Sequence, residues 1–303
     1  MQIKKGKHLK ELEMKKVDAI FTADWHIRND TPVCRTDDFL KAMYNKIMYI
    51  LSIQDKYKCP IFVAGDVFNK PRRLSKRDDN FWIDVFKQAT NDIIIIPGNH
   101  DLPDHNINEY SDSSLAILEN AIDNVVVYKT ILETIATVGT GNTRNIGMIH
   151  KMIHRDNPLK VNDKCISKKA AAVLRANSKY DIIISGDNHE TFVEEYENRI
   201  LVNPGSLMRT TAAQIDHKPC IFLYEESSNT VEQHFLPIKK EVVSRDHIDK
   251  EKEEDERMQS YVSKMRDDVE MTLSYKNNMK EELMVNKISE KTKEYVWGSF
   301  DVK

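Results

Sequence analysis

Residues 93–101 read IIIIPGNHD, and this stretch predicts both the fold class and the position of a functional site. Four consecutive isoleucines are too uniformly apolar for a sheet with one face in water, so they predict a buried strand of an α/β domain. Pro97 and Gly98 end the strand, and polar side chains follow at once. Four other apolar runs end in the same abrupt way. The polar groups after the five runs are Asp24 and His26, Asp66, Asn99 to Asp101, His150, and Asp187 to His189.

The ends of these five runs are expected to meet, because the carboxyl ends of strands in an open α/β sheet line the natural crevice for a ligand. Glycine supports this expectation. Of the nine glycines, Gly65, Gly98, Gly186 and Gly205 stand at these junctions, where a missing Cβ lets the backbone approach a ligand. The alternative is ordinary turn chemistry, since Gly-Asp after a strand is a common turn.

The whole chain fits a large α/β protein. Its 303 residues are 40% hydrophobic and 31% charged, which excludes general disorder. Short apolar runs alternate with amphipathic stretches, and residues 39–54 and 81–90 carry apolar side chains at helical spacing. No apolar run approaches the ~20 residues that cross a bilayer. The Lys-rich start lacks the apolar segment of a secretory signal, so a cytoplasmic location is expected.

Three segments are expected from the changes in composition. Residues 1–16 form a Lys-rich N-terminal extension, residues 17–238 form the α/β domain, and residues 239–303 form a charged helical segment that acts as a cap or docks a partner. A second helix is expected around Met279 to Ile288. The alternative for the C-terminal segment is a solvated helix packed back on the core. The net charge of −3 gives no global argument for a nucleic acid or an anionic membrane as partner.

Carboxylates, imidazoles and an amide oxygen, without a thiolate, are the ligands of a hard to borderline divalent ion. Seven candidate ligands are too many for one ion with open positions and suit two ions bridged by a carboxylate. Two such ions neutralise a phosphoryl group and lower the pKa of a bridging water, which supplies a hydroxide. A positioned histidine is the usual proton donor to the leaving oxygen.

The motifs Asp24-Trp25-His26, Gly65-Asp66-Val67-Phe68 and Gly98-Asn99-His100-Asp101 resemble those of the calcineurin-like metallophosphoesterase superfamily. Within it they are most similar to the SbcD-type DNA repair exonucleases, and residues 203–206 (Asn-Pro-Gly-Ser) fit the same group. The resemblance covers residues 17 to about 236. It implies an α/β fold of four layers, an α-β-β-α sandwich, with a C-terminal helical appendage. It also implies two divalent ions, with Mn²⁺ expected and Mg²⁺ as the alternative.

The resemblance also implies roles for individual residues. Asp24, His26 and His189 would bind the first ion and Asp66 would bridge. Asn99 and His150 would bind the second ion, and His100 would be the general acid. His154 is an alternative to His150, which is preferred because it directly ends an apolar run.

Two positions depart from the family pattern. Relatives commonly carry an acidic or imidazole group that orients the acid where this chain has Asn69. Asn69 is a candidate for the same task that can hydrogen-bond but adds no charge, and Asp101 is a candidate substitute. Relatives also usually carry a histidine where this chain has Asp187. Either Asp187 binds the second ion, or it turns away and leaves a weak second site.

The resemblance predicts a nuclease that hydrolyses DNA phosphodiesters, as an exonuclease or endonuclease, in DNA repair and recombination. The partners it implies are DNA and an ABC-type ATPase of the SbcC kind, with a homodimer possible. Two alternatives stay open. One is a phosphodiesterase or phosphatase for small nucleotides, and the other is a non-catalytic subunit that binds DNA ends or the ATPase.

Overall fold

The computed structural model describes residues 16–72, 75–130, 136–138, 144–161, 164–286 and 288–300. The predicted N-terminal extension, residues 1–16, lies outside this part of the chain except for Lys16. The chain divides into two compact units, one up to Ser244 and one from Arg245 onward. No helix in the described residues is both long enough and apolar enough to span a bilayer.

A six-stranded sheet forms half of the first unit, with the order β15-β14-β1-β2-β3-β4. Strands β1 to β4 run parallel, whereas β14 and β15 are antiparallel to their neighbours. The parallel arrangement places the carboxyl ends of β1, β2 and β3 at one edge. The strands are β1 (Ala19–Thr22), β2 (Ile61–Val63), β3 (Ile93–Ile95), β4 (Val125–Val127), β14 (Cys220–Glu225) and β15 (Thr230–Phe235).

A second sheet has five strands in the order β12-β13-β11-β6-β5. Strands β6, β11 and β13 are parallel, and β5 and β12 are antiparallel edge strands. The strands are β5 (Ala136–Val138), β6 (Ile146–His150), β11 (Ile182–Gly186), β12 (Phe192–Tyr196) and β13 (Arg199–Asn203). Two pairs of short strands follow β6 in the sequence. They are β7 (Ile153–His154) with β10 (Lys168–Lys169), and β8 (Lys160–Val161) with β9 (Lys164–Cys165).

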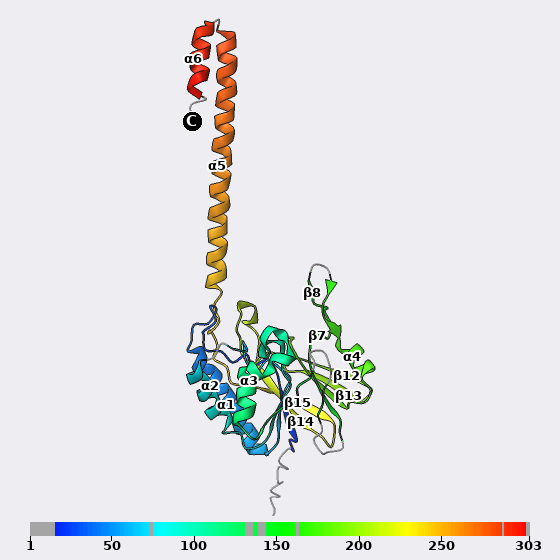
Figure 1. Cartoon of the computed structure of the whole chain (residues 1–303). Coiled ribbons are helices and arrows are strands. Elements are labelled where there is room, and N and C mark those ends of the chain that lie inside the picture. The colour runs from blue at the N-terminus through cyan, green and yellow to red at the C-terminus, as the bar shows by residue number, and fades with distance from the viewer. Residues whose placement is uncertain are drawn as a thin grey trace, which may run out of the picture. The chain divides into compact units, whose positions relative to one another are not determined.

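The first unit is a four-layer sandwich, as the sequence predicted (Figure 1). Successive side chains of each strand point to opposite faces of the sheet. Phe21 therefore packs against the other sheet, and Ile20 packs against the helices. Helices α1 (Phe39–Tyr57), α2 (Lys76–Phe86) and α3 (Ser114–Ala121) cover the six-stranded sheet, and α4 (Ala170–Ala176) covers the other. The strands read as uniformly apolar because both of their faces are buried.

Capping residues explain where the helices begin. The Asp38 carboxylate accepts the Lys41 N–H at the start of α1, and α1 runs three residues beyond the predicted end. Helix α2 begins at Lys76 rather than at 81, because Ser75 and Asp78 form a capping box. Short 3₁₀ turns span Asn99–Asp101, Pro103–His105, Ile107–Asp112 and Ala212–Gln214.

The second unit consists of α5 (Asp246–Val285) and α6 (Glu290–Phe300). The predicted helix around Met279 to Ile288 is therefore wrong, since α5 continues through Val285 and the next helix begins at Glu290. Neither glycine nor proline interrupts residues 246–285, so nothing local ends the helix earlier. Met258, Tyr261 and Val262 on α5 are exposed.

Candidate metal centre

The ends of five parallel strands bring the predicted side chains to one place. β1, β2 and β3 of the six-stranded sheet, and β6 and β11 of the five-stranded sheet, each lead into or end in a predicted site residue. Among the described residues, three groups have ligand atoms that lie within 4.8 Å of one another. They are Asp24 with His26 and His189, His26 with Asp66 and His100, and Asp24 with Asp66 and His150.

Asp66 lies at the middle of this arrangement. Its Oδ2 is 3.6 Å from His26 Nε2 and 3.4 Å from His150 Nε2. Its Oδ1 accepts the backbone N–H of His100 at 2.9 Å, which fixes the direction of the carboxylate. One carboxylate oxygen therefore faces two imidazoles from different sheets, as a ligand shared between two ions would.

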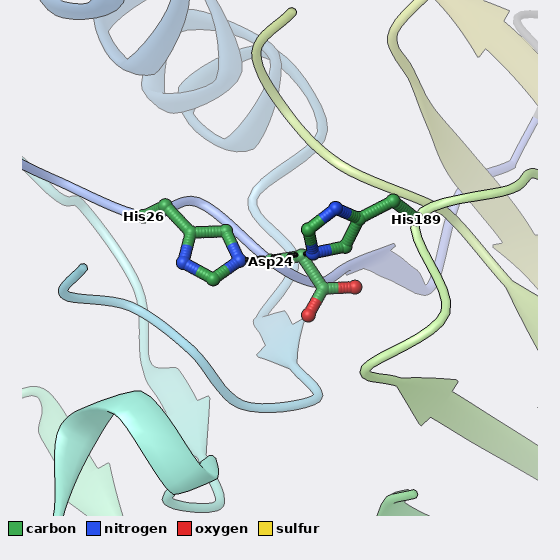
Figure 2. A group of neighbouring side chains, drawn as sticks. All are labelled: Asp24, His26 and His189. Atoms are coloured by element: carbon green, nitrogen blue, oxygen red, sulfur yellow. Dashed lines mark hydrogen bonds between the residues drawn. The ribbon is translucent and has the colours of Figure 1, made fainter. Parts of the chain in front are cut away.

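Asp24, His26 and His189 form one side of the centre (Figure 2). The Nε2 atoms of the two histidines lie 3.1 Å apart and point toward one another, with the Asp24 carboxylate beside them. The Oδ1 atom of Asp24 accepts the Asp187 N–H at 3.0 Å. Asp24 Oδ2 and His26 Nδ1 are buried and have no hydrogen-bond partner in the part of the chain that is described. An orphaned carboxylate oxygen beside two imidazole nitrogens fits a cation.

His150 and Asn99 form the other side. The Nδ1 atom of His150 lies 2.8 Å from the Ala64 carbonyl, so it carries a proton and donates, which is the usual way a protein orients a ligating imidazole. Its Nε2 lies 2.9 Å from Asn99 Oδ1. His154, the alternative, is instead 2.6 Å from Ser167 Oγ through its Nδ1. His154 belongs to none of the three ligand groups among the described residues.

Burial and mutual charge perturb the ionisable groups strongly. Burial, together with the Asp66 and Asp187 carboxylates, raises the pKa of Asp24 well above its ordinary value. Burial lowers the pKa of His26 to about 3. For His150 burial acts in the lowering direction, but Asp66 and Asp24 prevail and raise its pKa to about 10. Carboxylates crowded at low dielectric with imidazoles and an amide oxygen are a donor set that suits divalent cations, so the residues fit the predicted ions.

The backbone at this centre is strained where the ligands are placed. Asp24, His26, Asp66 and Asp187 all have positive φ, at 50°, 47°, 54° and 82°. Such a conformation costs about 1–3 kcal/mol per residue and persists only where its surroundings enforce it. Two backbone hydrogen bonds between the loops after β1 and β2 hold this conformation. The Asp24 N–H donates to the Gly65 carbonyl, and the His26 N–H donates to the Asp66 carbonyl.

Asp187 lies near the centre without joining a ligand group. Its pKa is raised, first by burial and also by Asp66, while His150 and His189 oppose the rise. It is in none of the three ligand groups of the described residues, although its own N–H holds Asp24. Its predicted role as a ligand therefore stays a prediction.

His100 is oriented by a backbone group. Its Nδ1 lies 2.9 Å from the carbonyl oxygen of Asn69, so the main chain at 69 contacts the imidazole and does not depend on the asparagine side chain.

Asp101, the predicted alternative for orienting His100, is hydrogen-bonded to the backbone, and its effect on His100 stays a prediction. Both oxygens of its buried carboxylate accept backbone N–H groups, from Phe68 at 2.8 Å, Gly98 at 2.9 Å and Val67 at 3.2 Å. Asp101 therefore ties the loop after β2 to the loop after β3.

Asn203 is a supporting residue that the sequence did not single out for this task. It ends β13, is fully buried, and its Nδ2 donates to the carbonyls of Asn188 and Glu190, on either side of His189. These two bonds fix the loop that presents His189. Its signals in the sequence are its place at a strand end and the Asn-Pro-Gly-Ser motif that it begins.

Comparison with known proteins places these features in a family. A family model described as the calcineurin-like phosphoesterase superfamily domain matches residues 41–227. The match includes Asp66, Asn99, His150 and His189 and begins after His26. No curated protein sequence matches the chain.

Several solved structures have a similar fold. A novel archaeal phosphodiesterase is 16% identical with a TM-score of 0.43, over 72% of this chain and 99% of that one. The protein TT1561 of Thermus thermophilus is 11% identical with a TM-score of 0.42, over 73% and 99%. A single mutant of Vps29 from Entamoeba histolytica is 14% identical with a TM-score of 0.37, over 72% and 99%.

Proposed function

The chain belongs to the calcineurin-like phosphoesterase superfamily, and we propose that within it the protein is a metal-dependent DNA nuclease of the SbcD type. The observation that carries hydrolysis is the position of Asp66 Oδ2, 3.6 Å and 3.4 Å from the Nε2 atoms of His26 and His150. A carboxylate oxygen placed in this way can hold two divalent ions close together, and this arrangement serves phosphate ester hydrolysis.

The proposed ligand assignment follows the two sides of the centre. Asp24, His26 and His189 hold the first ion, and Asp66 is shared. The second ion is held by Asn99, His150 and Asp187. We propose Mn²⁺, with Mg²⁺ as the alternative, because the donors are oxygen and imidazole nitrogen. When bound, the ions supply a hydroxide and neutralise phosphoryl charge.

His100 is the proposed general acid. Its Nδ1–H donates to the Asn69 carbonyl, which leaves Nε2 as the ring nitrogen able to carry a second proton. His100 is half-buried and has a ligand atom within 4.8 Å of those of His26 and Asp66. A protonated Nε2 can therefore reach the oxygen that leaves when the phosphodiester is cleaved.

The choice of DNA rests on the motifs at residues 24–26, 65–68, 98–101 and 203–206. We further propose an ABC-type ATPase of the SbcC kind as partner, with α5 and α6 as the docking segment, a possible homodimer and a cytoplasmic location. The exposed apolar residues Met258, Tyr261 and Val262 on α5 support a docking role, because a helix that needs no partner rarely exposes such a cluster.

Substrate and chemistry are tested together by incubating the full chain and Mn²⁺ with linear DNA and, in parallel, with bis-p-nitrophenyl phosphate. Degradation of DNA that falls at least about 100-fold in His100→Ala supports the nuclease. The matched control is His234→Ala, on β15 outside the centre. Ester cleavage without DNA degradation indicates a small-nucleotide phosphodiesterase. Inactivity on both substrates indicates a non-catalytic binding subunit.

Metal stoichiometry tests the ligand assignment separately. Titration calorimetry with Mn²⁺ is expected to show two ions per chain, and Asp187→Ala is expected to weaken the second ion selectively. One ion per wild-type chain contradicts the dinuclear assignment.

A further inference from the structure

A cavity of about 420 Å³ lies in the first unit between α1 and the segments around residues 208–209 and 237–242. It shares no lining residue with the metal centre. Five cationic side chains line it against two carboxylates, and the cations are Arg35, Lys41, Lys46, Arg209 and Lys239. Its volume suits a small molecule rather than a single ion.

Three of these cations are buried. Lys46 is 8% exposed, Arg209 is 6% exposed, and the side chain of Arg35 is 4% exposed. Such side chains are almost never this buried without a counter-charge, because removing a charge from water is costly. The cavity therefore holds positive charge that the protein has taken out of solvent.

The carboxylates of the cavity offset this charge only in part, although Asp37 favours the charged forms of Lys46 and Arg209 from a distance. Asp37 is engaged by Arg35 through two hydrogen bonds of 2.8 Å. Asp38 is the N-cap of α1 and accepts the Lys41 N–H. In the part of the chain that is described, neither Lys46 nor Arg209 has a carboxylate within 4 Å. Among the described residues, these two buried cations thus lack a carboxylate at salt-bridge distance.

Backbone carbonyls position the two unpaired cations. Lys46 Nζ donates to the Leu207 carbonyl at 3.0 Å, which uses one of its three N–H groups. Arg209 donates to the carbonyls of Ile215 at 3.0 Å and Lys239 at 2.6 Å, which uses two of its five. Both side chains are therefore fixed in position, and each keeps N–H groups that can donate to a ligand. Burial and the charges of Arg35 and Arg209 also lower the pKa of Lys46 to about 7.

We propose that this cavity binds a small molecule with a phosphate monoester, such as a nucleoside monophosphate. The dianion supplies the missing counter-charge, and Lys and Arg donors match its oxygens. Apolar side chains of Met208, Ile238 and Val242 line the same cavity and can receive a ring next to the phosphate. The same group occurs on a free nucleotide and on the 5′ end of a DNA strand, so the test includes both sources.

The cavity is connected to the metal centre through one residue, Leu207. The Leu207 N–H donates to the Asp24 carbonyl at 3.0 Å, and the Leu207 carbonyl accepts from Lys46. Binding in the cavity must nevertheless occur without metal, since none of the candidate metal-ligand groups found in the described residues includes a residue that lines it. This requirement separates the proposal from the proposed nuclease activity.

The test is titration calorimetry of the full chain at pH 7 in EDTA. The probes are inorganic phosphate, deoxyadenosine 5′-monophosphate, deoxyadenosine, and an oligonucleotide with and without a 5′-phosphate. We expect saturable 1:1 binding of the monophosphate and none of the nucleoside. Tighter binding of the 5′-phosphorylated oligonucleotide than of the monophosphate assigns the site to DNA ends, and the reverse assigns it to free nucleotides.

Variants identify the site. Lys46→Met keeps the side-chain length and removes the charge, so binding should weaken at least about tenfold. Lys41→Met, nearer the solvent, should weaken it less and guards against misfolding of the first variant. Lys56→Met, on the same helix but outside the cavity, is the matched control. The proposal is overturned if no monophosphate binds in EDTA, or if binding is equal in the wild type and both cavity variants.

Discussion

Replacing Asp101 with asparagine should damage the metal centre without touching a metal ligand. The Asp101 carboxylate accepts three buried backbone N–H groups, those of Val67, Phe68 and Gly98. An amide has one acceptor oxygen and one donor group, so at least one of the three N–H groups loses its partner in Asp101→Asn. Each buried donor left unpaired costs about 1–3 kcal/mol. The melting temperature should therefore fall by roughly 2–12 °C.

Metal affinity should fall as well. The two loops that Asp101 joins carry Asp66 and Asn99, and loss of a residue that orients ligands costs about 10–100-fold in metal affinity. The measurements are thermal unfolding and Mn²⁺ calorimetry at pH 8, because burial and Asp66 raise the pKa of Asp101 to about 7 and the carboxylate is ionised above it. Asp84→Asn, exposed on α2, is the matched control.

The reasoning is refuted if Asp101→Asn melts and binds Mn²⁺ like the wild type. A second outcome is equally informative. If the variant binds Mn²⁺ normally but loses turnover, Asp101 acts through His100 after all, and the backbone contacts are incidental.

Three further predictions concern the metal centre and the cationic cavity. In Gly98→Ala the new Cβ would stand 2.1 Å from Asp66 Oδ1, so the carboxylate must move, and calorimetry should show Mn²⁺ affinity at least about tenfold weaker; unchanged affinity contradicts this. Mn²⁺ at 100 times its Kd should stabilise the wild type by about 2.7 kcal/mol over the EDTA-treated protein, seen as a higher melting temperature, and an unchanged melting temperature counts against the site. The stability advantage of Lys46→Met over the wild type, measured by urea unfolding, should be larger at pH 6 than at pH 9. The wild type carries a buried charge below the folded pKa of about 7 and sheds it as the pH rises toward the unfolded value of 10.5, so its stability rises across that window; a constant difference would contradict this.

The amino-acid sequence determined the strands and the side chains that follow them. Runs such as residues 93–96 are short and wholly apolar, and the polar groups after them are next in the chain, so this information is local. The apolar runs alone predicted sheets covered on both faces, and the family motifs implied the four-layer sandwich. The end of α1 and the start of α2 were less predictable, because capping shifts a helix end without changing the apolar pattern.

Only the tertiary structure decided which groups touch. It placed one oxygen of Asp66 between His26 and His150, set the carbonyl of Asn69 rather than its side chain against His100, and turned Asp101 toward the backbone. It also buried Lys46, which reads in the sequence as an ordinary helix lysine. Strand periodicity sets the face on which a residue lies, but the direction of a side chain and its partners depend on how two sheets and their loops pack, and that packing is a sum of contacts distant in the chain.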